Sequence, residues 1–251
     1  MKGSRRAGLA LFLLTIFCSS AFAFSFAVIG DIQEGDQIFR QAVYLMNKDK
    51  TLLFAVCTGD MTPSGTKWEY DKYKSMTDAS GIKFYNVLGN HDKYRGGIRN
   101  YEKLFGRPYY SWDSGGAHFI ALENNSKNGL GSAQMSWLNA DLEANKDKPK
   151  FIFMHKPLFD ITGSFPDQVM KPETQARILM KVFEQNRVVA VFCGHIHGYA
   201  KEKVNGIVYI VTGGGGAHLH LPEFSGGYYH YTKASYDGRK FKNGTVKLSN
   251  E

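Results

Sequence analysis

Several short apolar runs in this 251-residue chain end at residues that commonly bind metal ions. The clearest run, 191–193, is followed by Gly194, His195, Ile196 and His197. If the backbone stays extended there, residues two apart project to the same side, so both histidines aim at one point. Two converging imidazoles suit a transition metal. On this motif alone, two solvated loop histidines are an equally good interpretation.

Four other runs end in a similar way. Asp31 and Asp60 each follow an apolar run and a glycine, Asn90-His91-Asp92 follows a third run, and His155 follows a fourth. Because open α/β sheets form their ligand crevice beyond the carboxyl ends of the strands, we expect these side chains to gather at one site. Carboxylate, amide and imidazole ligands without a thiolate favour Mn, Fe or Zn over Ca or Mg.

Helix-like and strand-like segments alternate in the first half of the chain, and strands dominate the end. Apolar residues recur at helical spacing within 36–46, 66–79, 98–105, 132–145 and 172–186. Strand-like patterns close the chain at 199–204, 207–211, 228–236 and 242–248. This order predicts an α/β layered domain. The composition, with 43% hydrophobic and 22% charged residues, is that of one globular domain with a substantial core.

Together the polar blocks resemble the signature of the calcineurin-like metallophosphoesterases. The matching blocks are Gly30-Asp31, Gly59-Asp60, Gly89-Asn90-His91-Asp92, His155 and Gly194-His195-Ile196-His197. The resemblance extends over residues 26–213. It implies a single-domain, four-layer α/β/β/α sandwich at 24–251 that holds two divalent metal ions.

The resemblance also implies two ligand sets that share Asp60. The first metal would take Asp31, Gln33, Asp60 and His197, and the second would take Asp60, Asn90, His155 and His195. Gln33 departs from the family pattern, which usually has histidine at this position. Its carbonyl oxygen is a neutral and weaker donor, so the first metal would be held more loosely or completed by water.

For such a site the expected reaction is hydrolysis of a phosphomonoester or phosphodiester by a metal-bridging hydroxide. Paired metals neutralise phosphoryl oxygens and lower the pKa of a bridging water toward ~7. His91 is the candidate general acid for the leaving group, and Asp92 is expected to hold its ring. Asn90 and His91 are also candidate substrate contacts.

The remaining histidines and cysteines have weaker patterns. His218 and His220 follow the glycine-rich loop 213–216, and we place His218 ahead of His220 as a substrate contact. Exposed loop histidines are the alternative for both. Cys57 and Cys193 lie in apolar runs, where free buried thiols are favoured over a disulfide.

The N-terminus has the pattern of a secretory signal peptide. Lys2, Arg5 and Arg6 precede an apolar run and a small-residue site ending at Ala23, so cleavage after Ala23 is expected. The apolar run is short for a bilayer span of about 20 residues, so no stable membrane insertion is expected after cleavage. Cleavage lowers the formal net charge from +8 to +5 and leaves a periplasmic or secreted protein.

Three function classes follow from these patterns. The preferred one is a hydrolase acting on a small-molecule phosphate ester, and its rival is a non-catalytic relative that binds phosphate-containing ligands, which Gln33 favours. A basic nucleic-acid-binding or envelope-binding module would depend on net charge alone. The chain lacks dense Lys/Arg blocks, so no specific nucleic-acid or protein partner is inferred.

Overall fold

The computed structural model describes residues 23–249, so the predicted signal peptide at 1–23 falls almost entirely outside the described residues. Within them, eleven strands form two sheets. The first sheet has the order β11-β10-β1-β2-β3, with β1 (Phe24–Ile29), β2 (Leu52–Cys57), β3 (Phe84–Asn86), β10 (His230–Tyr236) and β11 (Phe241–Lys247). The second has the order β4-β5-β6-β7-β9-β8, with β4 (Tyr110–Ser114), β5 (Ala117–Ala121), β6 (Lys150–Phe153), β7 (Val188–Cys193), β8 (Tyr199–Val204) and β9 (Ile207–Thr212).

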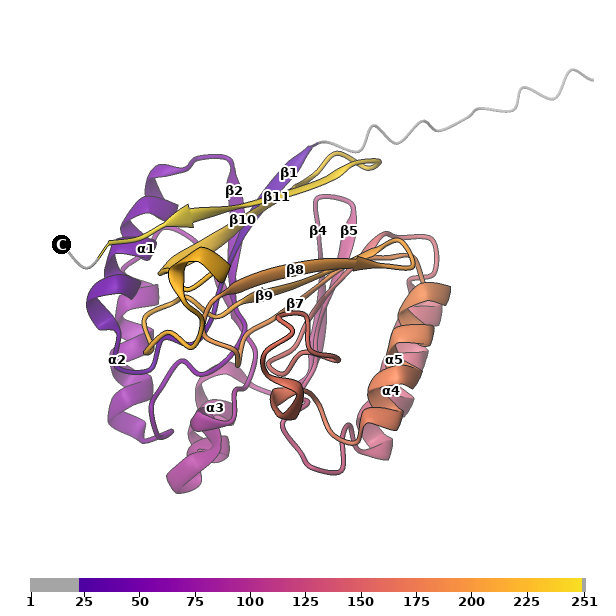
Figure 1. The fold of residues 1–251 in the computed structure, drawn as a ribbon, viewed down its shortest axis with the longest axis horizontal. Coiled ribbons are helices and arrows are strands. Elements are labelled where there is room, and N and C mark those ends of the chain that lie inside the picture. Colours follow the sequence, from indigo (N-terminus) through magenta and orange to yellow (C-terminus); the bar gives the residue numbers. More distant parts are fainter. Residues whose placement is uncertain (1–22, 250–251) are drawn as a thin grey trace, which may run out of the picture.

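Helices cover the outer face of each sheet, as Figure 1 shows. The first sheet packs against α1 (Asp36–Lys48), α2 (Lys67–Asp78) and α3 (Gly97–Phe105). The second packs against α4 (Ser132–Ala144) and α5 (Glu173–Gln185). Three short 3-10 helices, η1 (His91–Gly96), η2 (Pro166–Gln168) and η3 (Glu223–Ser225), lie in the connections within residues 23–249.

The two sheets meet through a core rich in phenylalanine. Phe26 on β1 is fully buried and contacts rings from both sheets, with Phe54 on one side and Phe119, Phe151 and Phe192 on the other. Alternation along β1 sends Ala27 and Ile29 to the opposite face, against the helices. The predicted four-layer α/β/β/α sandwich is therefore confirmed.

Parallel pairing brings the functional strand ends together. β1, β2 and β3 run parallel to one another, and so do β5, β6, β7 and β9.

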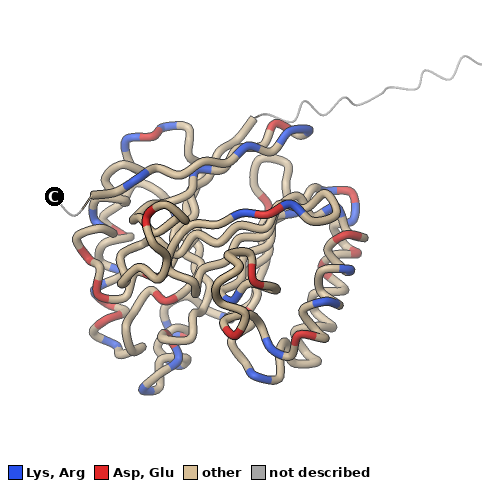
Figure 2. Tube along the Cα trace, in the orientation of Figure 1, with Lys and Arg blue, Asp and Glu red and all other residues tan. Residues whose placement is uncertain are grey.

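Cys57 and Cys193, at the ends of β2 and β7, are both buried and free. No helix in residues 23–249 combines the length and apolar character that crossing a bilayer requires. Charged residues are spread over the helices and edge strands (Figure 2).

His118 on β5 links the β4–β5 hairpin to α4. Its ring lies 2.8 Å from a carboxylate oxygen of Asp113 and 2.8 Å from one of Asp141. Burial alone would lower the pKa of His118, but the two carboxylates outweigh it and raise that pKa above its ordinary value.

This raised pKa gives a prediction for stability against pH. A group whose folded pKa is raised contributes stability below its unfolded pKa, near 6.5, and loses it as the pH rises through the folded value. We expect His118→Gln to lower the free energy of unfolding by about 1–3 kcal/mol at pH 6 and by less at pH 9. Thermal unfolding at both pH values measures this, and an equal loss at both would contradict a charged His118.

Candidate metal centre

Two groups of possible metal ligands lie at the carboxyl ends of the strands and share Asp60. Asp60, His155 and His195 form one group, and Asp31, Asp60 and His197 form the other. Within each group, one ligand atom per residue lies within 4.8 Å of the others. Only His195 is partly exposed, whereas the other four residues are buried. The shared carboxylate gives this site the composition of a two-metal centre.

Asn90 joins the group around His155. His155 Nε2 lies 2.9 Å from Asn90 Oδ1, 3.4 Å from Asp60 Oδ2 and 3.2 Å from His195 Nδ1. On the other side, His197 Nε2 lies 3.4 Å from Asp31 Oδ1. Six of the seven ligands implied by the sequence are therefore brought together from five strand ends, although they are separated by up to 166 positions in the chain.

Backbone carbonyls fix the orientation of two of the imidazoles. His155 Nδ1 donates to Thr58 O at 2.9 Å, and His197 Nδ1 donates to His218 O at 2.6 Å. A carbonyl oxygen can only accept, so the Nδ1 atoms carry protons and the Nε2 atoms face the carboxylates. Histidines that bind metals through one nitrogen usually have their other nitrogen held in this way, so the residues fit a metal pair.

The backbone is strained where it presents these side chains. Seven non-glycine residues within 23–249 have positive φ, and Asp31 (59°), Gln33 (47°), Asp60 (52°) and His195 (68°) are four of them. Each such conformation costs about 1–3 kcal/mol and persists only where the surroundings enforce it. Here the loops hold one another, since Asp31 N donates to Gly59 O and His195 N donates to both Asp31 carboxylate oxygens.

Charge coupling sets the pKa values of the buried groups. Burial would raise the pKa of Asp60, but the positive charge of His155 lowers it to about 2. Conversely, burial would lower the pKa of His155, but Asp60 raises it to about 9. Burial and the nearby His155 charge lower the pKa of His195 to about 2. A bound metal would therefore displace a proton from His155 while finding Asp60 ionised and His195 neutral.

The sequence profile of the calcineurin-like phosphoesterases matches residues 24–199, which is more than half of the chain. The chain belongs to the calcineurin-like phosphoesterase family. The matched region contains all the ligands that the sequence blocks implied, from Asp31 to His197.

Curated relatives within this family share about a quarter of their residues with the chain. It is 26% identical over 172 residues to a "probable glycerophosphodiester phosphodiesterase" of Arcobacter nitrofigilis, covering 62% of this chain and 61% of the relative. It is also 26% identical over 222 residues to a phosphoenolpyruvate phosphatase of Allium cepa, covering 76% of this chain and 45% of the relative. The chain thus spans less than two thirds of either relative's length.

Solved phosphoesterase structures share the fold at lower identity. The purple acid phosphatase PPD1 of yellow lupin superposes with a TM-score of 0.74 at 14% identity, covering 90% of this chain and 51% of that one. A dimetal phosphatase of Danio rerio superposes with a TM-score of 0.67 at 16% identity, covering 90% of this chain and 99% of that one. At these identities the similarity extends to the fold alone.

The prediction that Asp92 holds the His91 ring is wrong. Asp92 is fully buried, and its carboxylate accepts hydrogen bonds from the backbone N–H groups of Met61, Thr62 and Gly89. His91 Nδ1 instead lies 2.9 Å from Pro63 O. Burial, followed by the nearby charge of Asp60, raises the pKa of Asp92 to about 7. Asp92 therefore joins the loops after β2 and β3 and does not hold the His91 ring.

Gln33 contacts the shared carboxylate. Its Nε2 atom lies 3.4 Å from Asp60 Oδ2, and its backbone N–H donates to Asp60 O. The structure thus places Gln33 beside the shared Asp60, with its amide nitrogen toward the carboxylate. Its assignment as a metal ligand remains a prediction.

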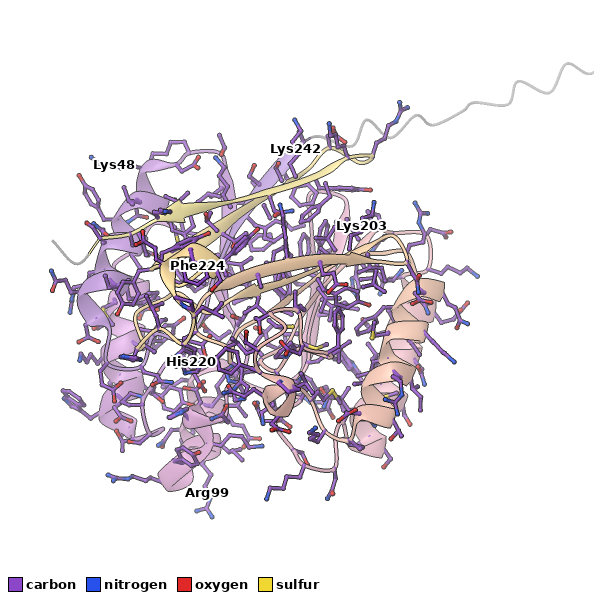
Figure 3. The ribbon with its side chains drawn as sticks, in the orientation of Figure 1. Lys48, Arg99, Lys203, His220, Phe224 and Lys242 are labelled. Atoms are coloured by element: carbon purple, nitrogen blue, oxygen red, sulfur yellow. The ribbon has the colours of Figure 1, made fainter. Side chains whose placement is uncertain are left out.

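The two loop histidines approach the site in the reverse of the expected order. The side chain of His218 is exposed, and the backbone carbonyl of this residue, rather than its ring, contacts His197. The His220 ring stacks on the His197 ring with centroids 3.9 Å apart, and His220 Nδ1 accepts from His197 N. Figure 3 shows His220 on the connection between β9 and β10.

Asn124 is a supporting residue that the sequence did not reveal. It is fully buried, and its Oδ1 accepts from the backbone N–H groups of His155 and Lys156, while its Nδ2 donates to Lys156 O. In sequence, Asn124 is merely part of an Asn-Asn-Ser tripeptide. Its role depends on backbone partners 31 and 32 positions away, which no local pattern specifies.

Several glycines allow the backbone to pass directly against the donor carboxylates. A Cβ atom on Gly89 would collide with the backbone nitrogen and carboxylate of Asp60, and one on Gly194 would collide with the carboxylate of Asp31. These glycines therefore follow the strands because there is no space for a side chain beside the carboxylates.

We expect Gly89→Ala to displace Asp60. Overpacking should lower the free energy of unfolding by about 1–3 kcal/mol, and the displaced ligand should weaken Mn²⁺ binding by about 10–100-fold. Gly244→Ala is the matched control, because its Cβ would meet open space on β11. Calorimetric Mn²⁺ titrations of both variants measure the effect, and equal affinities would show that Asp60 does not depend on this close approach.

Proposed function

We propose that the protein hydrolyses phosphomonoesters or phosphodiesters with the help of two divalent metal ions. The observation that supports this most strongly is the pair of donor groups that share the buried Asp60 carboxylate. Family membership supports phosphoester chemistry.

In this proposal each metal takes one of the two sets. Asp31, Gln33, Asp60 and His197 would hold one ion, and Asp60, Asn90, His155 and His195 would hold the other. When bound, the ions would neutralise phosphoryl oxygens and supply a water of lowered pKa. The donor chemistry suits Mn, Fe or Zn, and a relative 27% identical over 110 residues is a Fe(3+)-Zn(2+) purple acid phosphatase of Arabidopsis thaliana.

We infer that His91 acts as the general acid. Its backbone N–H donates to Asp60 Oδ1 at 2.8 Å, which places the residue beside the centre. Its Nδ1 donates to Pro63 O, so the imidazolium form of His91 would have its Nε2–H free to protonate the leaving oxygen. Asn90 and His91 would also contact the phosphoryl group. His218 and His220 lie next to His197, through the His218 carbonyl and the stacked His220 ring.

Export is part of the proposal. The basic and apolar pattern of residues 1–23 supports it, and β1 begins at Phe24, directly after the expected cleavage site. After expression in a Gram-negative host, we expect the protein in the periplasmic fraction, with Phe24 as its first residue. N-terminal sequencing measures this, and a retained Met1 would contradict cleavage.

The alternative is a non-catalytic relative that binds phosphate-containing ligands. Gln33 favours it, because a neutral amide donor weakens one of the two metal positions. A 26% identical relative from Arabidopsis thaliana also carries the name probable inactive purple acid phosphatase 9.

One experiment separates the two. The mature chain is reconstituted with Mn²⁺, Fe²⁺ or Zn²⁺, its metal content is measured, and p-nitrophenyl phosphate and its bis ester are supplied as substrates. The proposal predicts two ions per chain and metal-dependent turnover of at least one ester. Binding of phosphate without turnover at any metal would establish the alternative.

A further inference from the structure

A crevice of about 260 Å³ adjoins the candidate metal centre on the side of α2. Trp68 on α2 forms one wall and is 69% exposed, whereas Met61 and Met76 in the lining are buried. The crevice lies between α2 and the loop after β1, to which Gln33 and Glu34 belong.

The crevice and the metal centre have walls in common. Gln33 lines the crevice and also contacts Asp60 Oδ2. Pro63 lines it too, and its carbonyl oxygen is the partner of His91 Nδ1. The crevice and the metal centre are therefore neighbours, and Gln33 and Pro63 separate them.

We propose that this crevice binds the alcohol part of the phosphate ester and selects one that is apolar and carries no negative charge. The inference rests on the proposed function, because His91 would protonate the leaving oxygen. The alcohol part would then extend from the metal centre past Gln33, which contacts Asp60 and also lines the crevice. Trp68 is a specificity-determining residue in this arrangement.

Size and lining support an apolar alcohol part. Pockets for drug-sized ligands occupy about 300–1,000 Å³, so this crevice suits a phenyl or branched alkyl group better than a nucleoside. Trp68 offers an indole face for stacking, and the thioethers of Met61 and Met76 adapt to an apolar surface.

The charges in the lining disfavour anionic alcohol parts. Three carboxylates, Glu34, Asp36 and Glu69, accompany one ammonium group, Lys72. Lys72 pairs with Asp36, and Glu69 is held in the capping box of α2. Glu34 is exposed and has no hydrogen-bond or ion-pair partner among residues 23–249, so its charge remains to repel an anion.

Non-hydrolysable phosphonates test this without depending on catalysis. Calorimetry with the Mn²⁺-reconstituted mature chain compares phenylphosphonate, methylphosphonate and 4-carboxyphenylphosphonate. We expect Trp68→Ala to weaken phenylphosphonate binding by about fivefold to tenfold and to leave methylphosphonate unchanged. We expect Glu34→Gln to strengthen binding of the carboxylated ligand by about two- to fivefold. Tyr44→Ala, an exposed aromatic on α1 outside the crevice, is the control and should change none of these.

Equal losses for phenyl and methyl ligands in Trp68→Ala, or no loss for either, would overturn the inference. The proposed function fails in a different way: wild-type protein would bind phenylphosphonate through Trp68 and yet hydrolyse no phosphate ester. In that case the crevice would stand as a ligand site of a non-catalytic protein.

Discussion

Replacing Asp60 by asparagine is expected to remove both metal ions and to lower kcat/KM by at least about a thousandfold, since paired metals are worth several kcal/mol of transition-state stabilisation. Asp60 is the one residue common to both donor groups in residues 23–249. Asparagine has nearly the same shape and tolerates the positive φ of 52° at this position. The change should therefore remove the charge that the two donor groups share while keeping the size and backbone conformation of the residue.

Asp71→Asn is the matched control for this variant. Asp71 lies on the surface of α2, where it pairs with Lys67, and its side chain is 46% exposed. It should retain two ions per chain and full activity in the same metal analysis and p-nitrophenyl phosphate assay. An Asp60→Asn protein that kept both ions and its activity would show that Asp60 does not bridge them.

Replacing His91 by alanine is expected to lower kcat by about 10²–10⁴-fold while the metal content stays at the wild-type value. The reason is that His91 lies beside Asp60 and Asn90 but belongs to neither donor group. The loss should be larger for an alkyl phosphate than for p-nitrophenyl phosphate, because nitrophenolate leaves readily without a proton.

Two results would assign His91 differently. Loss of bound metal in His91→Ala would place the ring among the metal ligands. An equal loss of kcat for both esters, with metal retained, would mean that His91 stabilises the phosphoryl group rather than protonating the leaving oxygen.

The strand ends were predictable because their signals are local. Each apolar run stops at a glycine and a polar residue, and parallel pairing then brings Asp31, Asp60 and Asn90 to one edge. The helix at 67–78 was equally predictable, because apolar residues recur at helical spacing within 66–79. The capping box of Thr66 and Glu69 was seen only in the structure.

What the sequence did not reveal depends on distant backbone groups. β10 pairs with β1, which places Tyr236 opposite Phe24. The residues of either strand do not indicate which strand will be the partner. The carbonyl of Pro63 that holds His91 and the N–H groups that hold Asp92 are likewise absent from any side-chain pattern. Every residue has a backbone carbonyl, so the sequence gives no signal for a contact to a particular one. Such contacts can be recognised only when the positions of the loops are known.

The most direct test of a shared two-metal centre is an anomalous difference map from crystals of the mature chain grown with Mn²⁺. Two peaks are predicted, one between Asp31 and His197 and one between His155 and His195, each in contact with a carboxylate oxygen of Asp60. A single peak, or two peaks of which one lacks contact with Asp60, would contradict the account.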